Sequence, residues 1–166
     1  WKPKKSSINT YKNEYNNNLH LKSLGPEPLG KKFNQFYFQK YIKGRNRIIK
    51  DILMDQKFVS GIGNIYASEI LFLSKIKPTR NVKTLKESEI NKILKFTKKV
   101  LKNAINFGGS SIKNFSNSGG KKGLFQQYFK VYGKKGEKCS TKNCIFKIIR
   151  IVINNRATFY CSKCQK

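Results

Sequence analysis

Acidic residues are scarce in this chain. Eight Asp and Glu stand against 36 Lys and Arg in 166 residues, so the formal net charge is +28. A field of that sign attracts polyanions and would repel itself without one. A proteome rich in Lys and Asn would explain part of the excess lysine, but such a bias does not usually deplete acids this far. Nucleic acid is therefore the expected partner.

Two other features are missing. No apolar run approaches the length that crosses a membrane, and no signal-peptide pattern is visible. No long amphipathic helix offers a continuous apolar face to lipid, so an anionic membrane surface is a distant second to nucleic acid as a partner. The composition fits a reduced, intracellular compartment, and we expect no membrane contact.

Cysteine is also rare, and the few cysteines are grouped. The only four are two close pairs near the end of the chain, Cys139 with Cys144 and Cys161 with Cys164. Two such pairs around a β-rich segment are typical of a structural zinc site, in which four thiolates form a tetrahedron. Two disulfides are the alternative, disfavoured because the chain does not resemble a secreted cystine scaffold. We predict one structural Zn²⁺ and a rigid hairpin over residues 148–160, which contains Arg156.

The remaining chain divides into three parts. Residues 1–23 read as a linker or the remnant of an N-terminal region, because they are rich in Lys, Asn and Ser without a clear period. Residues 24–118 form the expected helical domain, and residues 119–166 carry a Gly-punctuated, strand-like stretch and the cysteines. The predicted fold class is mainly α with a small β zinc ribbon.

Hydrophobic periodicity places four helices between residues 31 and 107. Two short ones are separated by Gly44, and a third begins near Asn64. The longest runs from Thr84, which has capping-box spacing with Glu87, to a stop at Gly108. The aromatic and aliphatic residues of this region are expected to form its core.

The turn Gly61–Ile62–Gly63–Asn64 precedes the third helix. Its glycines allow a tight turn and a close backbone approach, and a helix start offers unpaired N–H groups and the positive end of a dipole to an anion. Gly63 and Asn64 are therefore candidates for a phosphate site. A purely structural turn between two helices explains the same residues equally well.

Several blocks together resemble a known family. Read in order, they are LGPEPL, LMDQKFVSGIGNIYASEILF, INFGGSSIKNF, VYGKKGEKC and RATFYCSKCQK. They look like the C-terminal half of bacterial formamidopyrimidine-DNA glycosylases over residues 24–166. The resemblance implies a helix-two-turn-helix domain followed by a zinc-finger hairpin, in a base-excision repair enzyme that removes oxidised purines such as 8-oxoguanine and cuts the abasic strand. The related endonuclease VIII branch usually departs from Asn-Ile-Tyr-Ala, so the purine-specific branch is favoured.

The resemblance also implies roles for single residues. Asn64 would contact the phosphate backbone at the lesion, and Arg156 would contact it from the other side. Tyr132 and Lys134 are weaker candidates, for which a packing tyrosine and a solvated lysine are equally good interpretations. A loop that closes over the extruded base would include four further residues, Gly119, Gly120, Lys121 and Gly123, although any surface linker would also favour glycine. The four-residue gap between Cys139 and Cys144 departs from the commonest family spacing and affects only the shape of that knuckle.

The family's catalytic groups find no match here. They are an N-terminal proline whose amine attacks the sugar, an adjacent glutamate and a lysine of the same domain. Pro3 is internal, and its acylated nitrogen is not nucleophilic. Since translation starts with Met, and its removal normally needs a small next residue, a chain opening with Trp1 is expected to be a fragment or a truncated gene product.

Two function classes follow from these observations. The first is the DNA-binding half of a glycosylase and AP lyase acting on damaged duplex DNA, a monomer in the bacterial cytoplasm associated with the nucleoid. The alternative is a stand-alone, catalytically inactive, zinc-dependent DNA-binding module. A ribosomal-type RNA-binding zinc protein is suggested by charge alone.

Overall fold

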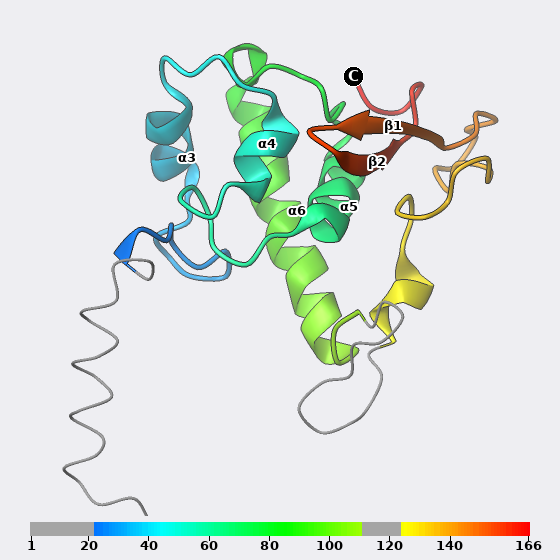
Figure 1. Cartoon of the computed structure of the whole chain (residues 1–166), viewed down its shortest axis with the longest axis horizontal. Coiled ribbons are helices and arrows are strands. Elements are labelled where there is room, and N and C mark those ends of the chain that lie inside the picture. The colour runs from blue at the N-terminus through cyan, green and yellow to red at the C-terminus, as the bar shows by residue number, and fades with distance from the viewer. Residues whose placement is uncertain (1–21, 111–123) are drawn as a thin grey trace, which may run out of the picture.

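The computed structural model describes residues 22–110 and 124–166. Helices α3 (Gln35–Ile42), α4 (Ile49–Met54), α5 (Asn64–Ser74) and α6 (Glu87–Asn106) come first, with the 3₁₀ turn η1 (Val82–Thr84) before α6. The 3₁₀ turn η2 (Phe125–Tyr128) then leads to the antiparallel strands β1 (Ile149–Ile153) and β2 (Arg156–Tyr160) (Figure 1). The predicted class, mainly helical with a small β hairpin at the C-terminal end, is confirmed.

Helix α5 is the centre of the molecule. It packs against α4 and α6 on the helical side and against β2 of the hairpin. An α-helix with neighbours on most sides must be apolar around most of its circumference, and α5 is. Ile70 and Leu71 belong to the main core, whereas Phe72 belongs to a second cluster beneath the ribbon. One helix therefore joins the two cores.

Helix α6 stops where the sequence predicted but starts later. Gly108 and Gly109 take left-handed φ values of 71° and 83°, and the Gly109 N–H closes the helix on the Ala104 carbonyl at 2.7 Å. The predicted capping box between Thr84 and Glu87 is wrong. Thr84 ends η1, and the Glu89 carboxylate accepts from the Lys86 N–H at 2.8 Å instead. Arg80 selects this register because it also binds Glu89.

The hairpin turns through two asparagines. The paired strands run from Ile149 opposite Tyr160 to Ile153 opposite Arg156. Asn154 and Asn155 between them have φ values of 47° and 59°, the left-handed region that asparagine tolerates and that a two-residue hairpin turn needs. Arg156 therefore lies directly after the turn, at the tip of the hairpin.

The expectation of strand-like runs before the hairpin is wrong for residues 124–148. Phe125 lies in η2, and the only ladder contacts are the isolated bridges of Leu124 and Lys138. Phe125 and Phe129 are buried in the main core, so tertiary packing against the helices overrides the local preference for strand. Within the described ranges, no helix is both long and apolar enough to span a bilayer.

The close backbone approach occurs at a different glycine from those predicted. A Cβ on Gly61 or Gly63 would meet nothing within 4 Å, although Gly61 needs its left-handed φ of 79°. A Cβ on Gly25 would lie 2.4 Å from the Phe58 carbonyl group. Gly25 thus lets the segment before α3 cross the turn after α4, and the space above Gly63 stays open.

Candidate nucleic-acid interface and metal centre

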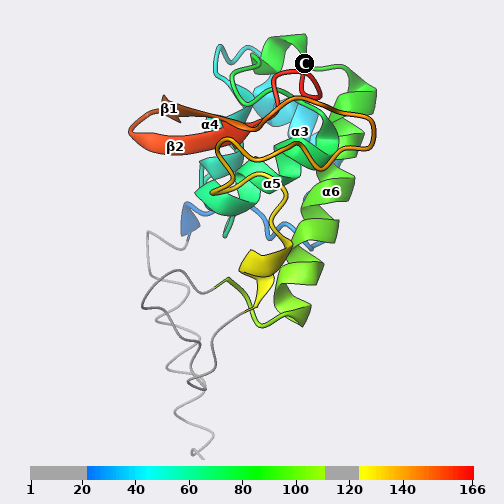
Figure 2. The same ribbon diagram turned by 90° about the vertical axis from the view of Figure 1, so that its right-hand side faces the viewer.

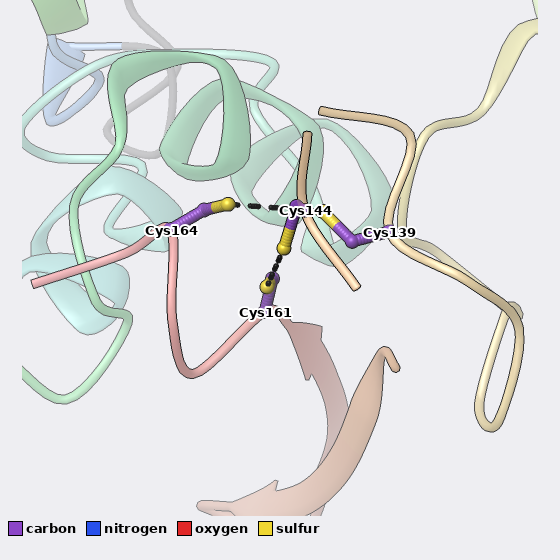
Figure 3. A group of neighbouring side chains, drawn as sticks. All are labelled: Cys139, Cys144, Cys161 and Cys164. Atoms are coloured by element: carbon purple, nitrogen blue, oxygen red, sulfur yellow. Dashed lines mark hydrogen bonds between the residues drawn. The ribbon is translucent and has the colours of Figure 1, made fainter. Parts of the chain in front are cut away.

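The four cysteines converge on one point (Figure 3). Their sulfur atoms all lie within 4.8 Å of one another, with 3.8 Å between Cys139 and Cys164 and 3.7 Å between Cys144 and Cys161. All four are free, and these separations far exceed a disulfide bond. A tetrahedron with metal–sulfur bonds of about 2.3 Å has sulfur atoms about 3.8 Å apart. The donor set and its spacing therefore fit one metal ion.

The wider first knuckle keeps this geometry by making a turn. Asn143 takes a left-handed φ of 62°, and the Cys144 N–H donates to the Thr141 carbonyl at 3.1 Å. Lys75, just after α5, donates to the Thr141 hydroxyl at 2.6 Å. The extra residues thus change the knuckle and leave the ligand positions intact.

The end of the chain ties this centre to the helices. The Cys161 N–H donates to Gln165 Oε1, whose amide Nε2 donates to the Ile76 carbonyl, both at 2.9 Å. The Lys77 N–H donates to the Lys166 carbonyl at 2.9 Å. The second knuckle is therefore held directly on the loop after α5.

The start of α5 is open. Gly63 is its N-cap residue, and no side chain caps the helix. The N–H groups of the first turn can therefore meet an anion, and the absence of a Cβ on Gly63 leaves room for one. The predicted helix start at Asn64 is confirmed, while a phosphate contact there remains a prediction.

Asn64 reaches from this helix start to the hairpin. Its Nδ2 donates to the Ala157 carbonyl at 2.9 Å, and its second contact, to the Tyr132 hydroxyl, is long at 3.4 Å. Its Oδ1 is buried without a hydrogen-bond partner among the described residues. One amide hydrogen thus fixes the side chain beside the hairpin, and the other is only weakly engaged.

Arg156 is adjacent to the carbonyl that Asn64 holds. Its side chain is exposed, and its guanidinium has neither a hydrogen bond nor an ion pair with any described residue. The structure therefore places the Asn64 side chain against the residue that follows Arg156, although the two elements lie far apart in the sequence. An exposed guanidinium without a partner among the described residues is suited to a charge-assisted contact with an oxyanion.

Tyr132 lies in the same group because α5 holds its backbone. The buried Glu69 carboxylate accepts from three consecutive N–H groups, those of Lys130, Val131 and Tyr132, at 2.8, 3.0 and 2.9 Å. The Tyr132 ring packs edge-on against Phe159 of β2 at 5.1 Å. Sequence reasoning missed Glu69, although an acid inside an otherwise apolar helix was a visible signal.

The structure gives no support for a DNA contact at two other predicted sites. Lys134 pairs with Glu137 at 2.9 Å, so its ammonium is engaged within the chain. The predicted lesion-loop residues, Gly119, Gly120, Lys121 and Gly123, lie outside the described residues.

Sequence reasoning also missed two charged residues of α4. Lys50 is 1 % exposed and donates to the Thr158 hydroxyl of β2, while Asp51 accepts from Asn154 in the hairpin turn. A Lys-Asp pair inside an apolar run was the available signal.

Comparison with known proteins gives one consistent match. The family model described as the H2TH domain of formamidopyrimidine-DNA glycosylase matches residues 24–116. The formamidopyrimidine-DNA glycosylases of Listeria innocua and Zymomonas mobilis are 44% and 45% identical over 146 and 147 residues, 88% and 89% of this chain. The chain spans about half the length of these relatives, 53% of each, and corresponds to their C-terminal portion.

Solved structures agree. The MutM (Fpg) protein of Thermus thermophilus matches with a TM-score of 0.84 and 34% identity over 92% of this chain and 57% of its own. The Lactococcus lactis Fpg in complex with DNA containing an abasic site matches with a TM-score of 0.80 and 35% identity, over 98% of this chain and 56% of its own.

Proposed function

This chain belongs to the formamidopyrimidine-DNA glycosylase family, and on that premise we propose that it is the DNA-binding half of a base-excision repair glycosylase and AP lyase acting on oxidised purines. The observation that carries the proposal is that Asn64, at the uncapped start of α5, binds the carbonyl of Ala157, the residue next to Arg156 in the hairpin. The solved structure of the Lactococcus lactis Fpg is a complex with DNA that contains an abasic site, which supports damaged DNA as the partner.

In the proposed complex, Asn64 and Arg156 bind the backbone at the damaged nucleotide. Arg156 offers a rigid fork of donors to phosphate oxygens, and the Asn64 amide and first-turn N–H groups of α5 donate alongside it. An extruded nucleotide needs its backbone held on both flanks, and contacts to phosphate position DNA without reading its sequence. Gly63 would leave space for the phosphate, and Tyr132, whose hydroxyl lies 3.4 Å from Asn64 Nδ2, would contact the same group. Lys134 would contribute only after releasing Glu137.

The metal of the proposed complex is one structural Zn²⁺ held by the four cysteines. When bound, it supplies no chemistry beyond fixing the two knuckles in one tetrahedron. Its effect on DNA binding is indirect, because the hairpin that bears Arg156 lies between the knuckles.

The nucleophile lies outside this chain in the proposal. No residue here matches the family's N-terminal proline amine, so we assign the chain no catalytic residue. Borohydride reduction with an 8-oxoguanine duplex tests this point, since a Schiff base with the sugar would be trapped as a covalent adduct. We expect binding without trapping, and a trapped adduct would overturn the assignment.

The DNA contact itself is tested by comparing two arginines of one hairpin. Replacing Arg156 with Ala should weaken binding to a duplex carrying a stable abasic analogue by about 1.5–3 kcal/mol, since it removes charge-assisted hydrogen bonds. Arg150→Ala is the matched control, because it removes the same charge from exposed β1. If the two substitutions weakened binding equally, Arg156 would contribute only as one of many surface charges.

The salt dependence of the same measurement tests the kind of contact. The logarithm of affinity should fall with the logarithm of salt concentration by about 0.9 per phosphate contacted. A nearly flat dependence would contradict phosphate-dominated binding, and a preference for structured RNA would favour the ribosomal-type alternative.

A further inference from the structure

Helix α4 is connected to Arg156 by a buried chain of hydrogen bonds. Lys50 Nζ donates to Thr158 Oγ1 at 2.5 Å, and that hydroxyl in turn donates to the Arg156 carbonyl at 3.2 Å. Lys50 is 1 % exposed and Thr158 is fully buried. A hydroxyl that accepts one bond and donates another transmits a fixed geometry from the helix to the backbone of Arg156.

The next residue of α4 holds the other side of the hairpin tip. Asp51 Oδ2 accepts from Asn154 Nδ2 at 2.8 Å, in the turn just before Arg156. Figures 1 and 2 both show the β1–β2 turn beside α4. With Asn64 bound to the Ala157 carbonyl, helix side chains hold the hairpin on both sides of Arg156, while its guanidinium stays free.

This arrangement is costly if it only packs the hairpin. A buried ammonium loses its hydration, and apolar side chains would fill the same space without that penalty. Lys50 stands within the run Ile48–Leu53, whose neighbouring residues Ile49, Ile52 and Leu53 are all fully buried. The burial of the Lys50 ammonium is therefore better explained by the geometry that its hydrogen bond imposes on β2.

We propose that Lys50 and Asp51 form a latch on the hairpin tip, acting as positioning residues that hold Arg156 where it meets the DNA phosphate. The latch rests on the proposed function, since it needs Arg156 to be a DNA contact. Neither latch residue contacts phosphate in this proposal.

The latch also links DNA binding to a proton. Burial lowers the pKa of Lys50 to about 8, Asp51 from the same helix opposes that shift, and the Arg156 charge on β2 adds to it. A phosphate bound to Arg156 would offset that neighbouring charge and raise the pKa of Lys50 again. DNA binding near pH 8 should therefore take up protons through Lys50.

A double-mutant cycle on the abasic-analogue duplex tests the latch. Lys50→Met keeps the length of the side chain and removes its charge and donor, and it should lower affinity about tenfold. In the Arg156→Ala background the same change should cost less than about twofold, because its route to the DNA is already gone. The latch would be overturned if Lys50→Met lowered affinity by the same factor in both backgrounds. It would also be overturned if Lys50→Met alone had no effect on affinity.

Matched variants separate this result from other causes. Lys98→Met removes one exposed positive charge from α6 and should cost less than about twofold on either background. If Lys50→Met does not fold, Thr158→Val breaks the same chain at its middle and should show the same coupling to Arg156. Failure of the proposed function is distinct, because Arg156→Ala itself would then be without effect.

Proton uptake on DNA binding distinguishes the proposed role of Lys50 from a purely structural one, which would not change that uptake. Calorimetric titration with the same duplex at pH 8, in two buffers of different ionisation enthalpy, should report uptake by the unaltered chain. The uptake should be lost in Lys50→Met and kept in Lys98→Met. Equal uptake in all three proteins would overturn the role of Lys50.

Discussion

The helical body (residues 33–106) and the ribbon (residues 131–166) are held together by different means. The body has a large apolar core shared by its four helices and joined by Phe125 and Phe129. The buried cluster of the ribbon includes three of the four clustered cysteines, and one of its other members, Phe72, comes from α5. If the cysteines are set aside, the ribbon has too little apolar core of its own to fold alone. We therefore expect the body to fold through burial of its apolar core, and the ribbon to depend on a metal ion held by its cysteines and on packing against α5.

Removing the metal should separate the two regions most sharply. Chelation, or Cys161→Ser, should unfold the ribbon while the helical signal in circular dichroism persists, because structural zinc supplies about 10–16 kcal/mol to small metal domains. DNA affinity should fall with the ribbon, and added Zn²⁺ should restore it after chelation. If the NMR resonances of the hairpin persisted in the chelated protein, the ribbon would not depend on a metal ion, and the contrast between the two regions would be wrong.

A cavity in the body should have the next largest effect. Leu71→Ala removes a fully buried side chain from α5 and should lower the free energy of unfolding by about 2–5 kcal/mol. The control is Ile105→Ala, at a side chain that is 65 % exposed, which should change it by less than about 0.5 kcal/mol. Denaturant titration with metal bound measures both. Similar costs would mean that α5 is not the centre of the core.

Glu69→Gln tests the joint between the regions. The amide keeps the shape of the side chain but replaces one acceptor oxygen by a donor that faces backbone N–H groups. We expect a loss of about 1–3 kcal/mol in stability, with faster hydrogen exchange at Val131 and Tyr132. Unchanged exchange there would show that the ribbon docks without Glu69.

The smallest effect concerns the pH dependence of stability. The folded pKa of Lys50 is about 8, below the usual value near 10.4, so the unfolded chain binds more protons between these values. Stability should therefore rise by about 1 kcal/mol between pH 7 and pH 9, relative to Lys50→Met. If the curves of unfolding free energy against pH ran parallel for the two proteins, the ammonium of Lys50 would be more hydrated than the structure shows.

Local sequence signals predicted the elements that depend on local properties. The helices follow from their apolar periods, the stop of α6 from its glycines, and the cysteine cluster from its spacing. The hairpin that carries Arg156 follows from the position of that segment between the two cysteine pairs. Each of these features is encoded within a few residues.

The features that sequence reasoning missed depend on distant partners. The start of α6 is set by Arg80 and Glu89, and η2 by burial of Phe125 against the helices. The sequence analysis assigned no role to Lys50 or Glu69, and each is buried against a segment more than 60 residues away. Periodicity carries no information about such partners, so the supports of the candidate site became visible only in the fold.

The most direct test of the central claim is a double-mutant cycle between Asn64 and Arg156, read as affinity for the abasic-analogue duplex. If both side chains bind the same stretch of backbone, Asn64→Ala and Arg156→Ala should each weaken binding, and their combined effect should differ from the sum by about 0.5–3 kcal/mol. Strictly additive losses, or no loss from either change, would contradict the shared grip of helix and hairpin on DNA.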